Sequence, residues 1–226
     1  MSIHIRNEFT SQRQLLTKSL QTWGKSHRRI FPWRKTKDPY KVLIAEVMLH
    51  RTRADQVVDS YSRFIRRFPT VSSLARARRS EINEIMRPLG LRWRADLVYD
   101  MAREIHSKHH DEIPSEIDDL KSLSGVSDYI AAAVLSLAHE CPVPILDTNT
   151  IRIIGRVFGR PVSDSSRRSE DFRILYKSIM DNLHPREFNL AMLDLAALVC
   201  FPVNPNCDRC PIQSHCEYGR TSGERN

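Results

Sequence analysis

The chain has 226 residues, of which 41% are hydrophobic and 27% charged, and this ordinary usage argues against a disordered, collagen-like or coiled-coil protein. Only 7 glycines are present, which is few for a protein of many strands and tight turns, so the composition favours an all-helical fold. Thirty-five Lys and Arg against 27 Asp and Glu give a formal charge of +8, which suits a polyanionic partner without naming one.

The basic excess lies in one part of the chain. Residues 25–103 carry 19 Lys and Arg against 8 Asp and Glu, whereas the remainder is slightly acidic. The first ten residues lack the apolar region of a signal peptide, and the longest apolar runs fall far short of the roughly 20 residues that span a bilayer. We therefore expect a soluble, intracellular protein with no membrane partner.

Hydrophobic periodicity predicts a series of short helices punctuated by prolines. Residues 9–23 place their apolar side chains on one helical face. A break follows at residues 26–34, and a second helix is predicted to begin near Pro39, because proline is favoured in a first turn. The same periodicity predicts further helices over residues 57–68, 81–86 and 95–105.

Residues 120–129 carry a helix-hairpin-helix pattern, in which an apolar pair and a turn with Gly125 precede a strongly helical run. Unpaired amides at the start of such a helix can bind a nucleic-acid phosphate without reading sequence. Gly125, Val126 and Ser127 are therefore candidate DNA-binding residues, and a plain helix–turn–helix within a bundle is the alternative. The usual second glycine is Ser127 here, with Asp128 beside it, which predicts a looser or differently shaped approach to phosphate.

Four of the five cysteines crowd into one stretch with the spacing C-x6-C-x2-C-x5-C. Thiolates this close in sequence can converge on one centre, and the spacing alone fits either tetrahedral zinc or an iron–sulfur cluster. Four unliganded buried thiols are the remaining alternative, and such a group would be open to oxidation. The fifth cysteine, Cys141, is predicted to be an ordinary core residue. The candidate ligands are Cys200, Cys207, Cys210 and Cys216.

The hairpin and the cysteine loop, in this order and about 75 residues apart, resemble the helix-hairpin-helix DNA glycosylases of the endonuclease III and MutY superfamily. Further matching motifs lie at residues 31–34, 38–41, 46–49, 89–90, 146–149 and 188–189. The resemblance implies an all-α, two-lobed fold with a [4Fe-4S] cluster in preference to zinc. Residues 29–141 would form a six-helix bundle ending in the hairpin, and residues 1–28 with 142–226 a helical domain whose loop 200–216 holds the cluster.

Three catalytic residues follow from the resemblance. Asp147 falls on the family's catalytic aspartate, and Glu46 on the glutamate of adenine- and mismatch-thymine-removing members. Tyr129 replaces the lysine with which bifunctional members attack C1′, so a monofunctional enzyme without lyase activity is expected. Asp147 would stabilise the oxocarbenium-like sugar and Glu46 protonate the leaving base across a shared pocket. Outside the family context, a helix N-cap for Asp147 and a salt-bridged surface position for Glu46 are the alternatives.

The resemblance also implies residues that hold the DNA while the target base leaves the stack. Arg51 is the candidate wedge that fills the vacated space, with His50 beside it, and Leu91 would probe the opposite strand. Read alone, Arg51 would be a solvated helix residue. Trp93, with an arginine on each side, is a further candidate for stacking on DNA.

The chain resembles two subfamilies, which differ in the base that they remove. The Phe-Pro-Trp-Arg motif, the arginine at 51 and the Gly-Leu pair at 90–91 favour the small thymine-DNA mismatch glycosylases, which remove thymine or uracil opposite guanine. Removal of adenine opposite guanine or 8-oxoguanine is the alternative, although adenine-specific members typically add a C-terminal domain, which we do not expect in this protein. A DNA-binding homologue without activity is the second alternative. The expected partner is double-stranded DNA containing a mismatch, bound by a monomer, in the cytoplasm at the nucleoid.

Overall fold

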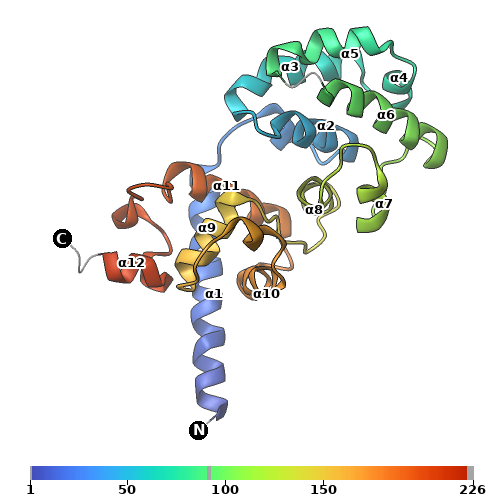
Figure 1. Ribbon diagram of the computed structural model, residues 1–226. Coiled ribbons are helices and arrows are strands. Elements are labelled where there is room, and N and C mark those ends of the chain that lie inside the picture. Colours follow the sequence, from blue (N-terminus) through green and yellow to red (C-terminus); the bar gives the residue numbers. More distant parts are fainter. Residues whose placement is uncertain (1, 91–92, 223–226) are drawn as a thin grey trace. The chain divides into compact units, whose positions relative to one another are not determined.

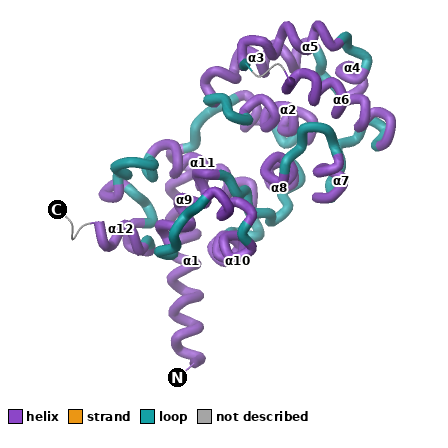
Figure 2. The backbone as a smooth tube through the Cα atoms, viewed as in Figure 1, coloured by secondary structure: helices purple, strands orange, loops and turns teal. Residues whose placement is uncertain are grey.

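The computed structural model describes residues 2–90 and 93–222, and every regular element in these ranges is a helix (Figure 1). The predicted all-helical class is therefore confirmed. Short loops join the helices (Figure 2), and none of the helices described is both long and apolar enough to cross a membrane. The chain divides into two compact units, Ile30–His139 and Met1–Arg29 with Glu140–Asn226, which we call the central unit and the terminal unit.

The central unit begins with a short 3-10 turn at Pro32–Lys35 and continues into the helix expected near Pro39. Asp38 caps this helix by accepting hydrogen bonds from the amides of Tyr40 and Lys41, and Pro39 occupies the first turn. The helices of the unit are α2 (Pro39–Leu49), α3 (Ala54–Arg67), α4 (Val71–Ala75), α5 (Arg79–Met86), α6 (Trp93–Lys108), α7 (Ile117–Ser122) and α8 (Asp128–Leu137), with a 3-10 turn at Arg87–Leu89.

Within the central unit, α2 packs against α3 and α8, and α6 packs against α4 and α5. α2 is almost wholly buried, because its apolar side chains point to all sides rather than to one face. The Tyr40 hydroxyl donates a hydrogen bond of 2.7 Å to the Phe68 carbonyl, which ties the start of α2 to the end of α3. α2 is thus held between α3 and α8 in this unit.

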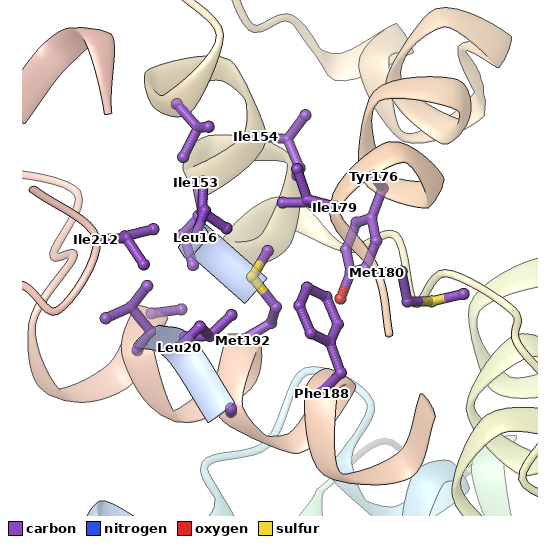
Figure 3. Packing of buried hydrophobic residues seen from close by; sticks show 14 of the residues in the cluster. Leu16, Leu20, Ile153, Ile154, Tyr176, Ile179, Met180, Phe188, Met192 and Ile212 are labelled. Carbon is purple, nitrogen blue, oxygen red and sulfur yellow. The ribbon is translucent and has the colours of Figure 1, made fainter. Parts of the chain in front are cut away.

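The terminal unit joins both ends of the chain. Its helices are α1 (Ser2–His27), α9 (Thr148–Val157), α10 (Glu170–Ile179), α11 (Pro185–Leu198) and α12 (Glu217–Ser222), with 3-10 turns at Asp164–Arg168, Cys207–Arg209 and Gln213–His215. Side chains from α1, α9, α10 and α11 form its core (Figure 3). A Cβ on Gly24 would lie 2.6 Å from the Ala191 Cβ, so α1 and α11 approach more closely than any larger residue allows.

α1 is longer than the helix predicted over residues 9–23. The apolar spacing on which the prediction depends includes Leu16 and Leu20, which are buried. Residues 2–8 and 24–27 of α1 lie outside this spacing, so hydrophobic periodicity does not predict them.

Candidate catalytic residues, DNA-binding elements and cysteine loop

Glu46 lies in the middle of α2 and is 4% exposed. The salt-bridged surface position considered from the sequence is therefore wrong. α2 packs against α8, whose first turn carries the half-buried Tyr129, so these two candidates lie on neighbouring helices of the central unit. A carboxyl excluded from water can pass a proton to a base placed against it without competition from solvent.

Asp147 is the N-cap of α9 in the terminal unit. Its Oδ1 accepts hydrogen bonds from the amides of Asn149 at 2.9 Å and Thr150 at 2.7 Å, and its Oδ2 accepts one from Asn149 Nδ2 at 2.9 Å. The side chain is half-buried. The helix N-cap expected as an alternative is thus present, and it holds the carboxylate in one orientation beside the positive end of a helix dipole.

The segment that leads into Asp147 is held by buried polar side chains. Asn189 of α11 donates a hydrogen bond of 3.1 Å to the Val143 carbonyl, and its Oδ1 accepts one from the Tyr176 hydroxyl at 2.6 Å. Burial, and then the nearby Asp147 carboxylate, raise the pKa of Tyr176 well above its usual value, so this hydroxyl remains a donor. Sequence reasoning noted Asn189 only as part of a matching motif, and it missed Tyr176.

The predicted hairpin connects α7 to α8. Gly125 has φ of 79°, and a Cβ there would lie 3.0 Å from the Leu97 Cβ, so both conformation and space require glycine. Ser127 is the N-cap of α8 and accepts a hydrogen bond from the Ile130 amide at 3.3 Å, while Val126 is buried beneath the turn. The serine in place of the second glycine therefore caps the helix through its hydroxyl.

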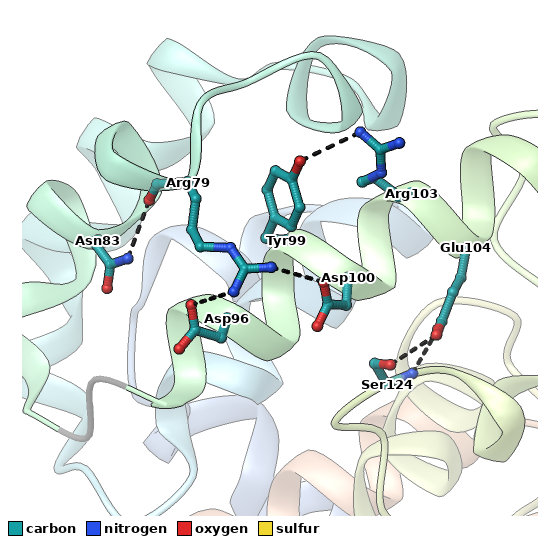
Figure 4. Close-up of polar contacts among 8 residues, drawn as sticks. All are labelled: Arg79, Asn83, Asp96, Tyr99, Asp100, Arg103, Glu104 and Ser124. Carbon is teal, nitrogen blue, oxygen red and sulfur yellow. Dashed lines mark hydrogen bonds and ion pairs between the residues drawn. The ribbon is translucent and has the colours of Figure 1, made fainter.

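A glutamate of α6 binds the hairpin through hydrogen bonds. Glu104 accepts two hydrogen bonds of 2.7 Å, one from the amide of Ser124 and one from its hydroxyl (Figure 4). Both bonds go to a charged acceptor in a partly buried site, where they are stronger than bonds at the open surface.

Glu104→Ala is expected to lower the free energy of unfolding by about 2 kcal/mol, because it removes both bonds and leaves a part-buried amide without an acceptor. Binding of duplex DNA should weaken with it, since the hairpin loses its support. Fluorescence anisotropy and thermal unfolding measure the two effects, with Glu112→Ala as the control at an exposed position. Unchanged DNA affinity in Glu104→Ala would contradict the role given to the hairpin.

The two residues after α2 were predicted to contact DNA. His50 and Arg51 are both exposed, and Arg51 has φ of 58°. The His50 ring meets the half-exposed Trp93 ring edge-on at 6.2 Å, and partial burial, Arg94 and Arg51 lower the pKa of His50. The imidazole is therefore neutral near pH 7. Leu91, the predicted probe of the opposite strand, lies outside the described residues.

The four candidate ligand cysteines line one narrow cavity in the terminal unit, beside apolar side chains of α9 and α11. All four are free thiols. Burial and the neighbouring cysteines raise the pKa of Cys210 to about 12 and also raise the pKa of Cys216. In the described ranges, no group of three or more His, Cys, Asp or Glu side chains is arranged to hold a metal ion.

Arginines of α9 connect this loop to the N-cap aspartate. Arg152 donates hydrogen bonds to Asn149 Oδ1 at 3.1 Å and to the Cys200 carbonyl at 3.0 Å. Arg156 lies 3.1 Å from Cys200 Sγ and caps two further loop carbonyls. A continuous path of hydrogen bonds therefore runs from Asp147 through Asn149 and Arg152 to the cysteine loop.

These elements match a known protein family. The model of the HhH-GPD superfamily base excision DNA repair proteins matches residues 44–176, a segment that contains Glu46, the hairpin, Tyr129 and Asp147. This chain belongs to that superfamily. The cysteine loop lies beyond the matched segment, so its assignment rests on other observations.

Individual relatives are similar over most of the chain. A thymine-DNA glycosylase of Aeropyrum pernix is 42% identical over 83% of this chain and 86% of its own length. A thymine/uracil-DNA glycosylase of Pyrobaculum aerophilum is 39% identical over 92% and 91%. The solved structure of a thermostable thymine-DNA glycosylase has a TM-score of 0.87 at 29% identity and covers 93% of this chain and 98% of that one.

Adenine DNA glycosylases form a more distant group. Several are 31% to 32% identical to this chain, which spans between 42% and 69% of their length. The chain is therefore a DNA glycosylase whose sequence is nearer to thymine-removing relatives than to these adenine-removing ones.

Proposed function

We propose that this DNA glycosylase removes thymine or uracil from mismatches with guanine, by hydrolysis and without cutting the strand. The similarity to thymine- and thymine/uracil-DNA glycosylases over most of both chains supports the target base. The absence of strand cleavage is proposed from one residue. By the family resemblance, Tyr129 occupies the position where bifunctional members carry a lysine. A phenol cannot form the Schiff base through which a lyase cleaves DNA.

The reaction breaks the bond between C1′ and the base nitrogen. Water adds to C1′ and loses a proton, while the departing base takes up the electron pair of the broken bond and is protonated. Asp147 would stabilise the positive charge that develops on the sugar, since its carboxylate is held in place by three hydrogen bonds. Glu46 would supply the proton to the base, and Tyr129 would position the carboxyl or the base.

We further propose that the loop holds a [4Fe-4S] cluster through Cys200, Cys207, Cys210 and Cys216. The residues fit such a group, because four thiols line one cavity walled by apolar side chains. These four thiols would hold the cluster as thiolates. When bound, it would cross-link the loop and keep the buried thiols deprotonated.

Tyr129→Lys is expected to gain lyase activity, because an amine at this position can attack C1′ of the abasic product. Borohydride added during the reaction should trap a covalent complex between the variant and DNA, whereas wild type and Tyr129→Phe should give none. A covalent complex with wild type would show that another of its lysines is the nucleophile and would overturn the monofunctional assignment.

The experiment that decides the function is a single-turnover assay on duplexes containing G:T, G:U, G:A, 8-oxoguanine:A and matched pairs, each read with and without alkali. Alkali-dependent cleavage at G:T and G:U alone is the expected result. Cleavage at adenine alone would select the adenine alternative, which the similarity to adenine DNA glycosylases keeps as second candidate. If the protein binds mismatched DNA but releases no base from any duplex, the inactive homologue is the correct alternative. We expect the protein to bind as a monomer.

A further inference from the structure

The turn after α2 holds Arg51 in a backbone conformation that arginine rarely adopts. Its φ of 58° lies in the left-handed region, where a residue with a Cβ loses free energy relative to glycine. Arg51 is exposed, so its own packing does not compensate for this loss. Strained residues persist where the surrounding structure fixes the backbone, and they gather at sites that bind ligands.

The side chain that fixes this turn comes from α6. Arg94 is 1% exposed, and its guanidinium donates hydrogen bonds to the Met48 carbonyl at 2.9 Å, to Thr52 Oγ1 at 3.2 Å and to the His50 carbonyl. These acceptors lie on both sides of Arg51. α2 has no basic residue in its own last turn, so Arg94 supplies the cation at the carbonyl end of the helix.

Arg94 also borders the hairpin. A cavity of about 60 Å³ is lined by Arg94 and His50 together with Gly125 and Ser127 of the hairpin. One buried guanidinium therefore touches both the turn that carries Arg51 and the space in front of the predicted phosphate-binding hairpin. A lysine could not replace it, because one ammonium lacks the planar fork that reaches three acceptors in different directions.

We propose that Arg94 is a positioning residue that holds the left-handed turn and thereby presents Arg51 to DNA as the target base leaves the stack. The proposal rests on the proposed function and on the family resemblance, which implies that Arg51 fills the space that the base vacates. It assigns to Arg94 no contact with DNA, and it explains why a fully charged side chain is kept inside the central unit.

The test is a double-mutant cycle of Arg94→Lys and Arg51→Ala on a G:T duplex with 2-aminopurine beside the thymine. Single-turnover excision and the fluorescence of the unstacked 2-aminopurine are both recorded. Arg94→Lys is expected to slow excision by about 100-fold and to suppress the fluorescence change, because a misplaced wedge costs as much as a missing one. The double variant should be no slower than the slower single variant.

Two controls separate positioning from general damage. Arg79→Met removes an exposed arginine that pairs with Asp96 and Asp100 of α6 (Figure 4), and it should leave both signals unchanged. Arg51→Gly in the Arg94→Lys background should restore the melting temperature without restoring the fluorescence change, since glycine adopts the left-handed conformation freely. This second variant keeps the test valid if Arg94→Lys alone fails to fold.

The proposal is wrong if the reduction in excision rate of the double variant equals the product of the reductions in the two single variants. It is also wrong if Arg94→Lys lowers the melting temperature but leaves the 2-aminopurine fluorescence change intact. The two proposals fail in different ways. If wild type unstacks the base and leaves thymine attached, the proposed function is wrong while the positioning role stands.

Discussion

Asp147→Asn is expected to slow base excision roughly 100- to 1,000-fold without destabilising the protein. The variant loses the negative charge opposite the developing positive charge of the sugar. It keeps an oxygen that can accept the hydrogen bonds of the Asn149 and Thr150 amides, and asparagine is as good an N-cap as aspartate. Single-turnover excision and thermal unfolding measure the two properties independently.

Asp147→Ala is the matched control for the N-cap. It should be as inactive as Asp147→Asn but less stable by about 1 kcal/mol, because α9 loses its cap. Equal melting temperatures for the two variants would contradict the N-cap, and full activity of Asp147→Asn would remove Asp147 from the mechanism.

Cys216→Ser is expected to abolish the broad visible absorption of an iron–sulfur cluster and to lower the free energy of unfolding by more than about 4 kcal/mol. Cys216 is 8% exposed and lines the cavity with the other three loop cysteines, so its loss would remove one of the four ligands of the proposed cluster. Excision should fall as well, because the hydrogen-bonded path from the loop through Arg152 reaches the side chain that holds Asp147.

Cys141→Ser serves as the comparison, since Cys141 is half-buried and lies outside the loop. This variant should keep the visible absorption and lose little stability. A purified wild-type protein that contains zinc and no iron would contradict the cluster while leaving the four ligands in place.

The sequence was most informative where local chemistry determines structure. Proline at position 39 after Asp38 predicts the start of α2, and the structure has the helix begin there. The glycine of the hairpin predicts a turn between two helices, and the structure has this turn with Gly125 in the left-handed conformation. In each case the signal lies within a few residues of the feature that it predicts.

Features that depend on distant parts of the chain could not be predicted. Glu46 looks like a surface glutamate until α3 and α8 are packed around α2. Arg94 follows Trp93 in a basic stretch, which favours a solvent-facing side chain, yet it is buried against carbonyls more than forty residues earlier. The left-handed Arg51 has no sequence signal either, because neither glycine nor asparagine marks the position.

The division of the chain also determines the order in which its parts can fold during synthesis. The central unit is one continuous segment, Ile30–His139, so all its partners are present once that segment has left the ribosome. The terminal unit differs, because α1 is made first and packs mainly against α11, which is made long afterwards. Leu16 and Leu20 of α1 therefore remain exposed to water until the last third of the chain has been synthesised. The cysteine loop follows α11 and only α12 and the C-terminal residues are made after it, so any metal that the loop binds enters a chain that is almost completely synthesised.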